Sequence, residues 1–283
     1  MSESKHLSGL ARGLNMSRTS NKIVVSGFLV ALVVYLARAV SERWIIGIPM
    51  SVTDAVTSSL VVFVAWALAR ELEPDHPWPA ALSMAMSLLV AFWYVPAALV
   101  VVAATAAVRM ITGTVGKPLA MFDLGLLAIV GYASGGTLAT WSIAIFVFVF
   151  LRIAPEVGRL RWWAVGALTV GFVVGWYTGD LSPITVTAST GAAALGFLLL
   201  AIVGASKADV SAKTDARSGS IEPKRLAMSR LAAGVIIASA TLIGGLDMMW
   251  EIAPIGIALV IVAIVSLLPG LQGPTSDGLP DRS

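Results

Sequence analysis

The sequence predicts an all-α membrane protein, a polytopic bundle of about ten transmembrane helices. Apolar residues make up 58% of the 283 residues, charged residues only 12%, and the mean hydropathy is +0.89. A soluble fold of this length could not bury so much apolar surface. The apolar residues form long blocks with almost no charge, and most of the 19 lysines and arginines lie between these blocks, as charges that flank membrane spans do.

The first predicted span covers residues 23–40 and follows a basic leader, residues 1–22, which we expect in the cytoplasm. The block ends in Ala37-Arg38-Ala39, which faintly resembles a signal-peptidase site. The leader is long for a signal peptide, however, so we expect an uncleaved span. A second apolar block, residues 52–69, predicts the next span.

Two apolar blocks, residues 79–108 and 119–151, are long for one span each, so each is either one steeply tilted, kinked span or two short spans joined by a turn. Thirty helical residues would extend about 45 Å, whereas the hydrocarbon core is about 30 Å thick. Trp93-Tyr94 and Pro96 lie in the middle of the first block, and such residues favour an interface turn. Ser134-Gly135-Gly136-Thr137 supplies a similar break in the second. Splitting both blocks gives ten spans, and leaving them whole gives eight.

The rest of the chain alternates apolar and polar stretches. Apolar blocks at residues 162–177, 184–203, 231–246 and 255–268 predict four more spans. The polar segment that separates the last two from the others reads as a flexible linker. We therefore expect five regions: a basic leader (1–22), a main transmembrane bundle (23–205), a cytoplasmic linker (206–225), a C-terminal transmembrane hairpin (226–270) and a disordered tail (271–283).

The distribution of lysine and arginine predicts the orientation, because short cytoplasmic loops collect these residues. With a cytoplasmic N-terminus, the ten-span arrangement places 17 of the 19 on the cytoplasmic side, and the eight-span arrangement places 15 there. Both termini are cytoplasmic in either case, and we expect a multi-pass protein of a prokaryotic plasma membrane. The lipid bilayer is the expected partner, and a second copy of the chain or another membrane protein is a further candidate. The net charge of +3 forms no single patch, which argues against nucleic acid.

The richest polar cluster, residues 70–79, is expected to be a cytoplasmic loop. Glu71, Glu73, Asp75 and His76 place three carboxylates and an imidazole within six residues. Such a set could hold a divalent cation or supply acid and base groups. The prolines of this segment keep the chain extended, so a structural loop is the preferred interpretation, with a metal or catalytic site as the alternative. No cofactor can be assigned.

Charges near the ends of the blocks form a second candidate set. We expect Arg109, Lys117 and Asp123 at one cytoplasmic rim, with Arg109 and Asp123 as a pair and Lys117 free to bind an anionic head group. No block carries a charge at its centre. A proton relay through an intramembrane carboxylate is therefore not expected.

Three functions remain open. A transporter or channel for a small or apolar solute is preferred, and the ten-span topology resembles the drug/metabolite transporter superfamily in size and orientation. An enzyme acting on lipid or isoprenoid substrates would use the Glu71–His76 loop with Arg109 and Lys117 as anion clamps. That loop resembles the acidic loop of intramembrane prenyltransferases in location, although their Asp-x-x-x-Asp pattern is missing. A non-catalytic subunit of a membrane complex is the third. Having no cysteine, the chain can form neither disulfides nor thiolate metal sites.

Overall fold

The computed structural model describes residues 19–41, 51–114, 186–207 and 221–268, together with single positions at 129, 166, 169–170, 173, 177 and 210. Within these residues every regular element is an α-helix, which confirms the predicted all-α class. The described helices are α1 (Thr19–Val40), α2 (Val52–Leu72), α3 (Trp78–Val90), α4 (Ala98–Thr112), α8 (Ala188–Ser206), α9 (Pro223–Glu251) and α10 (Ala253–Leu267).

Four of the described helices, α1, α2, α8 and α9, are long and apolar enough to cross a membrane, and α3, α4 and α10 are shorter apolar helices. These helices are consistent with a membrane protein. The count of ten spans is not confirmed by these four candidates. Most of the expected spans at 119–151 and 162–177 lie outside the described residues.

The predicted break in residues 79–108 is confirmed. Helix α3 ends at Val90 and α4 begins at Ala98, and the turn between them contains Trp93, whose residue is 51% exposed. In the same turn the Tyr94 ring stacks on Trp250, with centroids 5.2 Å apart. Proline at position 96 favours the break because it cannot donate the backbone hydrogen bond that a continuous helix requires.

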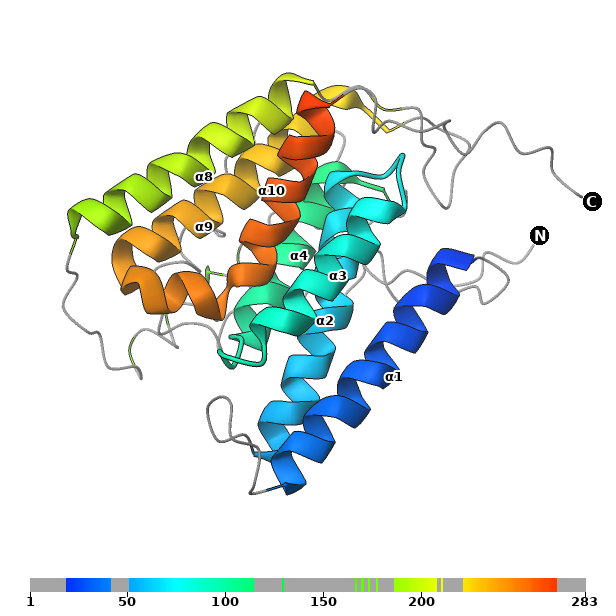
Figure 1. Cartoon of the computed structure of the whole chain (residues 1–283). Helices are drawn as coiled ribbons and strands as arrows, with labels where there is room; N and C mark the ends of the chain where they lie inside the picture. The colour runs from blue at the N-terminus through cyan, green and yellow to red at the C-terminus, as the bar shows by residue number, and fades with distance from the viewer. Residues whose placement is uncertain are drawn as a thin grey trace, which may run out of the picture.

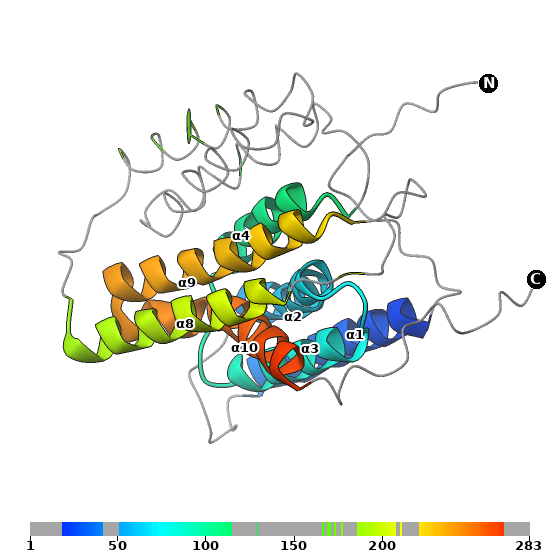
Figure 2. The same cartoon turned by 90° about the horizontal axis from the view of Figure 1, so that it is seen from above.

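Helix α2 forms the centre of the bundle. It packs against α1, α3, α4 and α10, while α9 packs against α8, α4 and α10 (Figure 1). Seen from above, α9 lies between α4 and α8, and α2 lies between α4 and α3 (Figure 2). Helices α9 and α10, which cover most of the expected C-terminal hairpin, pack together and share one apolar core with the amino-terminal helices.

Helix α9 begins earlier than the apolar block that predicted it. It starts at Pro223, inside the segment expected as a linker, and its first two turns carry Lys224, Arg225 and Arg230. Proline suits this first position because its missing N–H has no helical partner there. Near its other end the helix is broken at Gly245, whose φ of 75° and ψ of −168° are conformations open to glycine.

Helices α8 and α9 approach closely at Gly234. A Cβ atom at this position would overlap the Cβ atom of Ala201 and would lie 3.2 Å from the carbonyl oxygen of Phe197. Small residues at such contacts let two apolar helices pack backbone to backbone. Gly196, which lies on α8, has open space where its Cβ atom would stand.

Gly234→Ala is therefore expected to destabilise the protein by about 1–3 kcal/mol through overpacking. Gly196→Ala is the matched control and should be neutral, or should stabilise by roughly 0.5–1 kcal/mol, because alanine favours the helix. Thermal unfolding of the two purified variants in detergent measures the difference. Equal unfolding temperatures for both variants would contradict the close α8–α9 contact.

Candidate functional site

A layer of buried ion pairs lies at one end of the bundle, where α2, α4 and α8 end and α3 and α9 begin. Five residues form this layer, which we call the ion-pair cluster: Glu71, Glu73, His76, Arg109 and Arg230. Buried charges are rare because removal from water is costly unless each charge is paired and hydrogen-bonded. The cluster is therefore the most unusual polar feature of the described residues.

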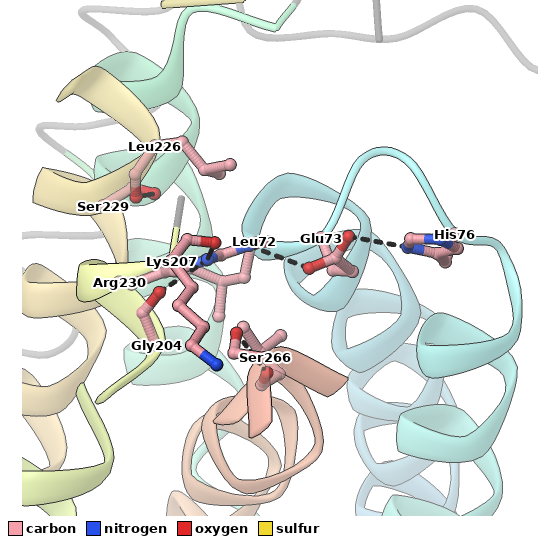
Figure 3. Close-up of polar contacts among 10 residues, drawn as sticks. Leu72, Glu73, His76, Gly204, Lys207, Leu226, Ser229, Arg230 and Ser266 are labelled. Atoms are coloured by element: carbon pink, nitrogen blue, oxygen red, sulfur yellow. Dashed lines mark hydrogen bonds and ion pairs between the residues drawn. The ribbon is translucent and has the colours of Figure 1, made fainter. Parts of the chain in front are cut away.

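Arg230 joins three helices. Only 1% exposed, it donates from Nη2 to Oε2 of Glu73 at 2.8 Å (Figure 3). Its Nε donates to the carbonyl oxygen of Leu72 at 2.9 Å, and Nη1 donates to that of Gly204 at 2.6 Å. Leu72 and Gly204 lie in the last turns of α2 and α8, where carbonyl groups lack partners within the helix. One guanidinium on α9 thus completes the ends of two other helices.

Glu73 lies between Arg230 and His76 (Figure 3). Its Oε1 is 3.0 Å from Nδ1 of His76, three residues further along the chain. Both residues are buried, and Nε2 of His76 has no hydrogen-bond partner within the part of the chain that is described. The short connection between α2 and α3 therefore folds its polar side chains inward.

Glu71 is completely buried and is held mainly from α4. Nε of Arg109 donates to its Oε1 at 2.7 Å, and the hydroxyl of Thr112 donates to Oε2 at 3.3 Å. The hydroxyl of Thr114 also donates to Oε2. Helix α4 is capped by Gly113, whose φ of 66° is left-handed, and this turn brings Thr114 back toward α2.

Two further arginines donate to backbone carbonyl groups at or near the ends of helices. Arg225 of α9 donates to the carbonyl oxygens of Ile111 at 2.9 Å and Met110 at 3.2 Å, in the last turn of α4. At the opposite end of the bundle, Nη1 of Arg38 donates to the carbonyl oxygen of Phe92 at 2.6 Å, just beyond α3. Cations at helix C-termini also interact favourably with the helix dipole.

The structure places the 70–79 segment at the end of α2, in a short connection and at the start of α3. Glu71 and Glu73 are buried and paired with arginines, His76 is buried and hydrogen-bonded to Glu73, and among these four residues only Asp75 is partly exposed. The described residues contain no group of three or more His, Cys, Asp or Glu side chains that could hold a metal ion. The geometry thus gives no support to a metal centre built from these four residues.

The expected cytoplasmic rim is described only in part. Arg109 lies at the end of α4 as predicted, and the structure shows it paired with Glu71. Asp123, its expected partner, and Lys117, the expected head-group ligand, lie outside the described residues. Sequence reasoning did not find Arg225 and Arg230 as site residues. The available signal was Pro223, which marks a helix start and so places both arginines on a helix.

No family model matches the chain, and no curated protein or solved structure matches it either.

Arg230→Met is expected to destabilise the protein by about 3–5 kcal/mol, because it leaves the Glu73 carboxylate buried without its cation. Arg225→Met serves as a control at a partly exposed arginine that also completes a helix end, and it should cost only about 1 kcal/mol. Thermal unfolding in detergent compares the two. Adding Glu73→Gln to Arg230→Met should recover part of the loss, since the buried charge is then removed. Equal losses for Arg230→Met and Arg225→Met would contradict this account.

Proposed function

We propose that the chain is a multi-pass membrane protein of about ten spans with both termini in the cytoplasm. We further propose that it transports a small or apolar solute across the lipid bilayer, and that the ion-pair cluster closes one end of its bundle. The observation that carries this proposal is the buried Arg230–Glu73 pair, which links α9 of the C-terminal hairpin to α2 of the amino-terminal helices.

We call a contact that opens and closes one end of the bundle a gate. This role explains why the pair is buried better than a purely stabilising role does. Apolar side chains of similar volume often stabilise a protein as well as a buried ion pair, so the pair is weak evidence for a purely structural role. Ionisable groups inside membrane helices are functional candidates by default. An ion pair also suits a contact that must separate, because both charges regain hydration when the end of the bundle opens to water.

The opposite end of the bundle is held by different contacts. There the backbone N–H of Ala97 donates to the carbonyl oxygen of Glu251 at 2.9 Å, and Tyr94 stacks on Trp250. The break of α9 at Gly245 lies close by in sequence. Transporters of several folds combine interrupted helices with alternate closure of the two ends. Two ends held by different chemistry could open separately.

The enzyme hypothesis receives less support from the same contacts. An acid, a base or a metal ligand needs a carboxylate that can reach a substrate, whereas Glu71 and Glu73 are each bound to an arginine. A non-catalytic subunit would need no gate. Cysteine labelling and solute-flux measurements distinguish it from a transporter.

A single cysteine can report whether the cluster opens, because the chain has no cysteine of its own. Ser229→Cys places a thiol at a buried position next to Arg230. Adding Glu73→Ala should raise the rate at which a water-soluble maleimide labels this thiol by about tenfold, the effect of 1.4 kcal/mol on an opening equilibrium. Adding Glu222→Ala instead, at an exposed carboxylate just before α9, should leave the rate unchanged. Equal rates in both backgrounds would contradict the gate.

Solute flux tests transport directly. Proteoliposomes containing the wild-type protein should take up glycerol, urea or indole faster than empty liposomes, as followed by light scattering for the first two and by fluorescence for indole. If none of the three probes enters faster and a fixed partner copurifies in mild detergent, the transport proposal is wrong and the subunit hypothesis is favoured.

The proposed topology places the two ends of α3 on opposite sides of the membrane. Pro77→Cys and Trp93→Cys put thiols at exposed positions just before and just after this helix. In intact cells an impermeant maleimide should label the cysteine at 93 and should reach the cysteine at 77 only after lysis. Labelling of both cysteines in intact cells, or the reverse order, would contradict the topology.

A further inference from the structure

Buried serines lie where α2 and α3 meet. Ser58 and Ser83 are completely buried, and Ser87 is 2% exposed. The hydroxyl groups of Ser58 and Ser87 have no hydrogen-bond partner among the residues that the structure describes. Ser83 makes only a long contact, 3.5 Å, with the carbonyl oxygen of Ala65. Buried hydroxyls without partners are uncommon in folded proteins, and each one calls for an explanation.

Their position in a helix does not explain the missing bonds. Other buried hydroxyls of this bundle donate to the carbonyl oxygen four residues earlier, as helical serine and threonine readily do. Ser59 donates to Ala55 at 2.7 Å, Thr105 to Val101 at 2.8 Å, and Ser266 to Val262 at 2.9 Å. Ser58 and Ser87 are on helices of the same kind and make no such bond. For Ser58 the equivalent acceptor, the carbonyl oxygen of Asp54, takes the hydroxyl of Thr57 at 3.1 Å.

The contact between Ser83 and Ala65 shows how the two faces meet. Ser58 lies seven residues before Ala65 and therefore on the same face of α2, and Ser87 lies one turn beyond Ser83 on the same face of α3. The helices run antiparallel, so Ser58 and Ser87 lie on the same side of the Ser83–Ala65 contact along the helix axes. Ser58 lies about 10 Å from this contact and Ser87 about 6 Å from it. The two hydroxyls thus lie within roughly one helical turn of each other along the interface.

A third hydroxyl contacts α3 at the residue that follows Ser87. Tyr35 of α1 is buried, and its hydroxyl donates to the carbonyl oxygen of Leu88, the residue after Ser87. A phenolic oxygen that donates one bond can still accept another. The junction of α1, α2 and α3 therefore presents hydroxyl groups from three helices within an otherwise apolar core.

We propose that Ser58 and Ser87 form a hydrogen-bonding subsite for a small neutral solute that carries hydroxyl groups, such as a short polyol. This inference rests on the proposed transport function and narrows its substrate class. Serine hydroxyls can donate to a solute hydroxyl and accept from it, and so replace the water that the solute loses. The two serines carry no charge that could compensate a charged solute for the loss of its water. A neutral solute therefore fits this subsite better.

The double variant Ser58→Ala and Ser87→Ala tests the subsite in proteoliposomes. Glycerol uptake should fall at least about tenfold, as expected when bonds worth 1.4 kcal/mol or more are lost. Ser59→Ala is the matched control, because it removes a neighbouring buried hydroxyl that already bonds its own helix, and it should change uptake less than twofold. Glycerol uptake that is equal in the double variant and the wild type would overturn the subsite while leaving transport intact. A fall in water permeability alone, with glycerol uptake unchanged, would also overturn it.

A second measurement is independent of transport. One molar glycerol should raise the unfolding temperature of the wild type by at least about 2 °C more than that of the double variant, because a ligand that binds the folded state stabilises it. Ser59→Ala should respond as the wild type does, so general effects of glycerol cancel. An equal rise in all three proteins would overturn the subsite. A larger rise in the wild type with no uptake of any probe would support the subsite and count against transport.

Discussion

The hydrogen bonds of Arg230 are the interaction on which the arrangement of the described helices most depends. Every α-helix ends with carbonyl groups that have no partner in the helix, and a membrane interior offers no water to complete them. In this bundle the guanidinium of Arg230 completes the ends of α2 and α8 and also pairs with Glu73. The fixed fork of donors in arginine makes this possible, since a lysine could not satisfy three groups in one plane. The position of α9 relative to α2 and α8 follows from these bonds.

The class of the protein and one of its turns could be predicted from the sequence, because both depend on local composition. Long uncharged apolar blocks predict apolar helices, and Trp93-Tyr94 with Pro96 predicts the turn between α3 and α4. The start of α9 was harder to find, since it lies at Pro223, inside the polar segment 206–225 that was expected to be a linker. Hydropathy measures how apolar a segment is, and it does not show that a polar segment will fold against buried partners.

The candidate site was predicted in part. Glu71, Glu73, His76 and Arg109 were chosen as polar groups of the 70–79 segment and of a block end, and the structure holds them in two groups, Glu71 with Arg109 and Glu73 with His76. Their partners could not be predicted, because the pair Glu73–Arg230 joins residues 157 positions apart in the chain. Arginine was interpreted only as a marker of membrane orientation, and its bonds to buried groups were not predicted. Arg109, Arg225 and Arg230 fit a cytoplasmic location in the proposed topology, yet each is engaged in bonds inside the bundle.

These arginines also bear on the length of the proposed spans. Helices α3, α4 and α10 have 13 to 15 residues, so each is about 20–23 Å long, whereas the hydrocarbon core is about 30 Å thick. A helix that ended below the membrane surface would leave carbonyl groups facing lipid, at a cost of several kcal/mol each. The hydroxyl of Tyr35 donates to the carbonyl oxygen of Leu88 in the last turn of α3, and Arg225 donates to carbonyl oxygens in the last turn of α4. Because these donors come from neighbouring helices, both short helices can end within the protein, and their length does not argue against the ten-span topology.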